Sequence, residues 1–256
     1  MAVSSVSLPI LTSYLDSLLR LGEIPDDSNA VNGLQVANRG EVNRIVAAVD
    51  ASQQTIDAAG EGGAGALILV HHGLFWDGNA PVTGRRYRRL RSLFDRDQAL
   101  YSAHIPLDVH PELGNNVALA ELLGLEIKGW FGQYKGIPIG VWGEMVTDRD
   151  LLVRRLDEKL GVQSRLIPGG PAKTGRVGII TGAGGGMIQD AIRTGLDTYI
   201  TGEGPHHTYF DASEDGVNLI YAGHYATEEL GVQRLAQHLS ARFGIPWEYH
   251  RHETGL

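Results

Sequence analysis

The chain has 256 residues, of which 43% are hydrophobic and 20% charged, a composition that excludes an intrinsically disordered protein. Its formal net charge of −8 provides no overall positive field for binding a long nucleic acid. The sequence contains no cysteine, which excludes disulfides, thiolate nucleophiles and iron–sulfur ligation. Any bound metal would therefore be held by nitrogen and oxygen ligands.

The apolar segments are short. None approaches the roughly 20 residues that a membrane span requires. The N-terminal segment also lacks a basic stretch followed by a continuous apolar run, the pattern of a secretory signal. We therefore expect a cytoplasmic protein without a membrane partner, and its length fits one large α/β domain or two packed lobes.

The first half of the chain alternates helix and strand patterns. A helix is predicted at 11–21, a strand at 44–49, a helix at 52–60, an apolar strand at 66–70 and a strand at 99–102. Strand, helix and strand at this spacing form a βαβ unit, and continuous apolar runs are typical of a parallel sheet. An arginine-rich run at 85–91 is expected on a helix, as a solvated face or a subunit contact.

The same pattern recurs in the second half. Strands are predicted at 177–180, 198–200 and 219–222, with helices at 187–194 and 228–243. Between the halves, a hairpin is expected around 136–138 and a helix at 149–160. We predict an α/β protein with two similar halves, 1–128 and 172–256, joined by an insert or connecting lobe at 129–171.

Candidate metal ligands follow three of the predicted strands. His71 and His72 come directly after the strand that ends at Val70, and the carboxyl ends of parallel strands are where ligand sites form. Because adjacent side chains of a strand alternate, the two histidines would serve one metal each, although such a pair can also be purely structural. Asp108 follows the next strand, where its carboxylate could bridge two cations or cap a helix.

The third group is His224 and Glu228, which follow an apolar strand at the start of a helix. Their spacing of four places both side chains on one helix face, although such a pair is also common on helix surfaces. Together, the three groups would supply three imidazoles and two carboxylates. This ligand set suits two divalent ions of zinc, manganese, iron or nickel better than calcium or magnesium.

Several motifs resemble those of the Nif-three-like family, whose members are often labelled type-2 GTP cyclohydrolase I homologues. The resemblance covers residues 32–34, 70–73, 103–108 with Asn115, 201–203 and 223–228, and so spans nearly the whole chain. One departure is the segment 29–32, which retains only the asparagine of an aspartate-asparagine pair that is typical of the family.

The resemblance implies two α/β halves that face each other around a dinuclear metal centre and assemble into a toroidal homohexamer. The ligands that it implies are His71, His72, Asp108, His224 and Glu228. It also implies that His104, Glu203 and His207 line the cavity.

A bound metal pair is typical of hydrolases, so we predict a metal-dependent hydrolase of a small, nucleotide-like substrate. Glu203 or His104 would shuttle the proton, or else orient a ligand histidine. The glycine-rich segment 181–186 could hold a phosphate or form a tight turn, and it lacks the last glycine of a dinucleotide-binding motif. The alternative is a metal-binding regulatory or partner-binding ring protein without turnover.

Overall fold

The computed structural model describes residues 5–255. The chain divides into two compact units. Unit 1 combines the residues up to Leu107 with Gly231–His252, and unit 2 combines Asp108–Leu230 with the residues from Glu253 onward. These boundaries differ from those of the segments 1–128, 129–171 and 172–256, which stay a prediction from the sequence pattern.

Unit 1 contains a five-stranded sheet in the order β13-β4-β5-β6-β2. Its strands are β2 (Gly33–Val36), β4 (Arg44–Asp50), β5 (Ala66–His72), β6 (Ala99–Ser102) and β13 (Trp247–Tyr249). All of them are parallel to their neighbours except β2, which is antiparallel to β6. The short strands β1 (Val6–Ser7) and β3 (Glu41–Val42) pair separately.

The helices of unit 1 are α1 (Leu8–Leu18), α2 (Gln53–Glu61) and α3 (Gly84–Asp95), and the short α4 (Ile105–Asp108) follows β6. Helix α1 begins earlier than predicted because Pro9 lies in its first turn, where a missing N–H costs nothing. Helix α2 is capped by Ser52, whose hydroxyl accepts a hydrogen bond from the Thr55 N–H at 3.0 Å. The arginine-rich run is helical, as expected, within α3.

Unit 2 contains a six-stranded sheet in the order β7-β8-β10-β11-β12-β9. Its strands are β7 (Ile127–Tyr134), β8 (Ile137–Glu144), β9 (Arg165–Pro168), β10 (Arg176–Ile180), β11 (Thr198–Thr201) and β12 (Asn218–Tyr221). Strands β7 and β8 form the predicted hairpin. Its turn residues Lys135 and Gly136 both have positive φ, as a tight two-residue turn requires.

The helices of unit 2 are α5 (Asn115–Leu123), α6 (Arg149–Leu160), α7 (Ile188–Arg193) and α8 (Thr208–Asp215), with a 3₁₀ turn, η1, at Gly184–Met187. Helix α9 (His224–Phe243) begins in unit 2, and its residues from Gly231 onward belong to unit 1. Over residues 5–255, no helix combines the length and the apolar character needed to cross a bilayer.

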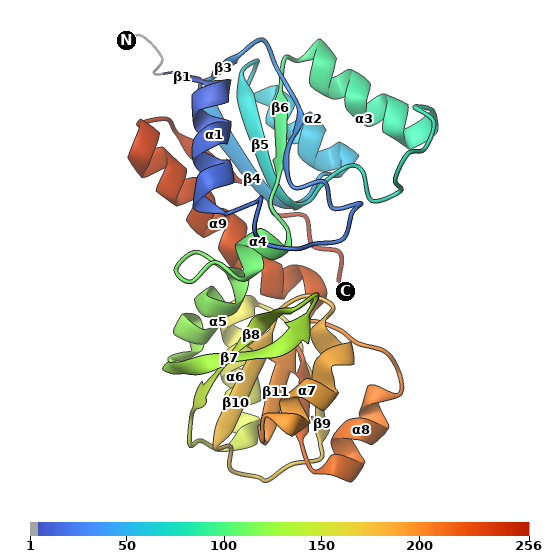
Figure 1. The fold of residues 1–256 in the computed structure, drawn as a ribbon, viewed down its shortest axis with the longest axis vertical. Helices are drawn as coiled ribbons and strands as arrows, with labels where there is room; N and C mark the ends of the chain where they lie inside the picture. The colour runs from blue at the N-terminus through green and yellow to red at the C-terminus, as the bar shows by residue number, and fades with distance from the viewer. Residues whose placement is uncertain (1–4, 256) are drawn as a thin grey trace. The chain divides into compact units, whose positions relative to one another are not determined.

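The two units share a topology. In each, three parallel strands follow one another along the chain, β4-β5-β6 and β10-β11-β12. In each, a strand that precedes these three in sequence, β2 or β9, pairs antiparallel with the third. Figure 1 shows both units as a twisted sheet flanked by helices, so the predicted α/β class with two similar halves is confirmed.

Candidate metal centre

Unit 1 brings three histidines together at the carboxyl ends of neighbouring strands. His71 and His72 are the last residues of β5, and His104 follows β6. One ring nitrogen from each lies within 4.8 Å of the others, close enough for the group to hold a metal ion. Trp76 packs edge-on against His104 at a centroid distance of 4.9 Å and so helps to shield the group from water.

His71 and His72 are each held at Nδ1 by an oxygen. The His71 Nδ1 lies 2.8 Å from the carbonyl oxygen of Ala103, and the His72 Nδ1 lies 3.0 Å from a carboxylate oxygen of Asp50. A carbonyl or an ionised carboxylate can only accept, so Nδ1 donates in both cases. The lone pair of each ring therefore resides on Nε2, the usual arrangement of metal-binding histidines.

His104 is held in the same way by Asp26, whose side chain is 6% exposed. The Asp26 carboxylate accepts hydrogen bonds from His104 Nδ1 at 2.9 Å, from the Ile105 N–H at 3.0 Å and from Asn32 Nδ2 at 2.7 Å. Burial acts to raise the pKa of Asp26. The hydrogen bond and the positive charge of His104, together with the hydrogen bond from Asn32, lower it by more, so the pKa of Asp26 lies below its ordinary value. Asp26 thus fixes the orientation of the His104 ring.

Unit 2 supplies His224 and Glu228 from the first turn of α9. The helix begins at His224, as the four-residue spacing requires, and His224 Nε2 lies 3.1 Å from Glu228 Oε2. On the other side of the ring, His224 Nδ1 lies 2.7 Å from Glu203 Oε1. Burial lowers the pKa of His224, but the two carboxylates outweigh this effect and raise it to about 9.

The glycine-rich segment supports this arrangement sterically. A Cβ on Gly182 would lie 2.0 Å from Glu228 Oε1, and Gly182 has a φ of +65°. Its N–H donates to the Thr227 hydroxyl at 3.0 Å, and the Gly185 N–H donates to the Glu203 carbonyl at 2.9 Å. These amides are engaged within the protein, which favours the tight-turn interpretation of the segment over a phosphate-binding loop.

Asp108 is the last residue of α4 and is buried. Its Oδ1 accepts a hydrogen bond from Asn115 Nδ2 at 2.8 Å. It does not cap α5, whose N-cap is Gly114. The Asn115 amide group thus orients the Asp108 carboxylate, as residues next to a metal site commonly do for a metal ligand.

Sequence reasoning did not single out Asp26 or Asp50. Asp50 ends β4 directly beside His72 in the sheet register, so its position at a strand end was a usable signal. Asp26 lies in a loop between α1 and β2 and matches no spacing pattern. Its role depends on a contact with His104, which is distant in sequence.

A sequence profile of the Duf34/NIF3 (NGG1p interacting factor 3) family matches residues 7–253. The chain belongs to this family. The Duf34/NIF3 match confirms the resemblance inferred from the motifs.

Relatives in the family match over nearly their full length. A protein of Deinococcus radiodurans called GTP cyclohydrolase 1 type 2 homolog is 45% identical, and the alignment covers 96% of this chain and 93% of that protein. A protein of the same name from Pyrococcus abyssi is 44% identical, with 96% and 98% covered. The crystal structure of TTHA1606 from Thermus thermophilus has a TM-score of 0.89 at 38% identity, with 98% and 100% covered.

Proposed function

We propose that this Duf34/NIF3 protein binds two divalent metal ions and hydrolyses a small, nucleotide-like substrate. The proposed ligands are His71, His72, Asp108, His224 and Glu228. The observation that carries the proposal is the common orientation of the histidines. In both units an oxygen acceptor holds Nδ1, so Nε2 is the ring nitrogen that would bind a metal ion. In His224, Nε2 lies 3.1 Å from Glu228 Oε2 and would give up its proton when a metal binds.

The donor set fits divalent ions of intermediate softness. It combines imidazole nitrogens with carboxylate oxygens, and the chain has no sulfur ligand from cysteine. Zinc, manganese, iron and nickel accept this mixture, whereas calcium and magnesium prefer oxygen alone. The names of the relatives, GTP cyclohydrolase 1 type 2 homolog, are consistent with hydrolytic chemistry on a nucleotide-like molecule.

When bound, the ions would supply an activated water and a Lewis acid for a carbonyl, amidine or phosphoryl group. Proton transfer would then fall to Glu203 or His104. The Glu203 side chain is 48% exposed while one of its oxygens contacts His224, so it can exchange protons with solvent or substrate as it orients the histidine. His104 is held more firmly, since Asp26 accepts from its Nδ1.

Elemental analysis of the purified protein tests the metal centre. We expect about two metal atoms per chain in the wild type and fewer in His72→Ala and in Glu228→Ala. His250→Ala and Glu214→Ala remove the same side chains outside the proposed ligand set and should retain the wild-type content. Absence of metal from the wild type, even after titration with zinc, manganese and iron, would contradict the proposal.

Turnover distinguishes the hydrolase from a metal-binding regulatory or partner-binding ring protein. Phosphoesters, cyclic amides and GTP are the substrates to screen. We expect Glu203→Ala and His104→Ala to abolish hydrolysis while metal content stays at the wild-type level. Full metal content with no hydrolysis of any of these compounds by the wild type would favour the regulatory role.

We also propose, from the family resemblance, that the chain forms a homohexamer in the cytoplasm. Sedimentation should then give six times the 27.7 kDa mass of one chain. A monomer or dimer at micromolar concentration would argue against the ring.

A further inference from the structure

Unit 2 contains a cavity of about 200 Å³ next to Glu203. It lies at the carboxyl ends of the parallel strands β11 and β12, where α/β sheets place ligands. The edge strand β9 and the start of α8 close its sides. Its volume corresponds to about seven water molecules, which suits a ligand built around a single small ring system.

The floor of the cavity is fixed by hydrogen bonds. The Thr208 hydroxyl donates to the Pro205 carbonyl at 2.6 Å, so the Tyr221 hydroxyl donates to the Thr208 oxygen. Gly204 makes this approach possible, because a Cβ there would lie 2.6 Å from the Tyr221 hydroxyl oxygen. These contacts fix the side of the cavity that Thr208 and Tyr221 form.

A cation faces this cavity from the sheet edge. Arg165 lies directly opposite Tyr221 in the β9-β12 register, so both side chains project from the same face of the sheet. Within residues 5–255, the Arg165 side chain has neither a hydrogen-bond nor an ion-pair partner. Its guanidinium group is thus available to a carboxylate or phosphate.

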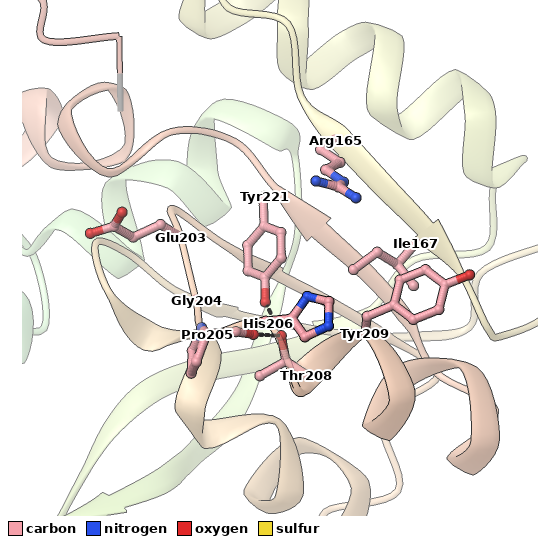
Figure 2. Close-up of a pocket in the computed structure, with 9 residues that line it drawn as sticks. All are labelled: Arg165, Ile167, Glu203, Gly204, Pro205, His206, Thr208, Tyr209 and Tyr221. Carbon is pink, nitrogen blue, oxygen red and sulfur yellow. Dashed lines mark hydrogen bonds between the residues drawn. The ribbon is translucent and has the colours of Figure 1, made fainter.

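Aromatic rings line the rest of the cavity. Figure 2 shows His206 and Tyr221 between Tyr209 on one side and Glu203 on the other. Tyr209 is 45% exposed, although large rings are usually buried, and so can stack on a ligand without rearrangement. Rings beside a guanidinium match a planar aromatic molecule that carries a negative charge.

We propose that this cavity binds the aromatic ring of an anionic substrate, with its carboxylate or phosphate on Arg165. The assignment rests on the proposed function in one respect, that the bound molecule is the substrate of the metal centre. Glu203 links the two, since it lines the cavity and accepts a hydrogen bond from His224. A ring held here would therefore place its neighbouring group beside the candidate metal ligand.

Calorimetric binding to the 256-residue protein tests the proposal with two probes, pyridine-3-carboxylate and adenosine 5′-monophosphate. Cyclohexanecarboxylate lacks the aromatic ring, inorganic phosphate lacks any ring, and nicotinamide and adenosine lack the charge. We expect at least one probe to bind the wild type about tenfold more tightly than its matched controls. Binding of only the carboxylate or only the nucleotide would identify the source of the anion.

Variants then locate the binding. We expect Arg165→Gln and Tyr209→Ala each to weaken it about tenfold. Arg155→Gln removes the same charge from an exposed position on α6, and this variant should bind the probes as the wild type does. No binding by either probe, or equal binding by Arg165→Gln and the wild type, would overturn the proposal.

Metal content separates this proposal from the proposed function. Each titration is repeated after chelation, and metal is counted on the same preparation. Probe binding that depends on Arg165 in a protein that takes up no metal would support the cavity and refute the metal centre. Two metal atoms per chain without probe binding would support the metal centre and refute the proposed ligand of the cavity.

Discussion

Gly182 lies against the candidate ligand Glu228, and its lack of a side chain permits that contact. We predict that Gly182→Ala displaces the carboxylate, because the new methyl group would overlap Oε1 and the positive φ would also be strained. Metal affinity should fall, and the backbone strain should destabilise the fold by ~1–2 kcal/mol. Metal titration and thermal melting measure the two effects.

Gly186→Ala is the matched control for that variant. Gly186 belongs to the same glycine-rich segment, has no atom within 4 Å of a built Cβ, and does not have a positive φ. The Gly186→Ala variant should bind metal as tightly as the wild type does. Equal metal affinity in both variants would show that Gly182 does not position Glu228.

Asp26 makes a pH-dependent contribution to stability. Its folded-state pKa lies below the ordinary value of 3.8, so the ionised carboxylate stabilises the fold above that pH. The contribution is lost as the pH falls through the folded-state pKa. We predict that Asp26→Asn costs about 1–3 kcal/mol at pH 7 and less at pH 3, which lies below the ordinary pKa of 3.8. Urea unfolding at both values measures the difference.

Asp215→Asn changes an exposed aspartate at the end of α8 and serves as the comparison. It should leave the free energy of unfolding nearly unchanged at both pH values. A loss in Asp26→Asn that is the same at pH 3 as at pH 7 would mean that the ionised carboxylate is not responsible.

The first turn of α9 is tied to the loop after β10 through Thr227, which is fully buried. Its hydroxyl accepts the Gly182 N–H at 3.0 Å and donates to the Gly223 carbonyl at 2.9 Å. Thr227→Val keeps the shape but leaves that N–H buried without an acceptor, so we predict a loss of about 1–3 kcal/mol. Thr227→Ser keeps the hydroxyl and should therefore keep both the stability and the metal affinity of the wild type. Chemical denaturation of the two variants provides the comparison.

Elements with a strong local signal could be predicted from the sequence. The apolar runs of β4 and β5 and the caps and periodicity of α2 and α6 mark their own positions. The short strands β2, β9 and β13 could not be predicted, because each depends on pairing with a strand distant in the chain. Helix α8 was not predicted either, since it is short and its N-cap residue, His207, makes no side-chain capping hydrogen bond.

The candidate site divides in the same way. His71, His72, Asp108, His224 and Glu228 could be singled out because each follows a recognisable strand. The groups that orient them were harder to predict, since the Asp26 contact with His104 and the Asp50 contact with His72 join distant parts of the chain. The cavity beside Glu203 requires the β9-β12 register, which the sequence does not reveal.

Metal binding should stabilise the whole molecule, because an ion that binds only the folded chain shifts the folding equilibrium. At a free metal concentration one hundred times the dissociation constant, the gain is about 2.7 kcal/mol per site. We predict that chelation lowers the melting temperature of the wild type and has little effect on His72→Ala. Calorimetry with and without a chelator tests this, and an equal response in both proteins would contradict it.

Because β13 pairs with β4, the sheet of unit 1 cannot be completed until late in synthesis on the ribosome. Unit 2 is almost entirely one continuous stretch, whereas Trp247 must return to Ile45 to complete the sheet of unit 1. At translation rates of about 5–20 residues per second, the β4 edge would wait about ten seconds or more for its partner. The nascent chain would therefore expose one unpaired edge of β4 until residues 247–249 have been synthesised, and a chaperone could protect that edge in the interval.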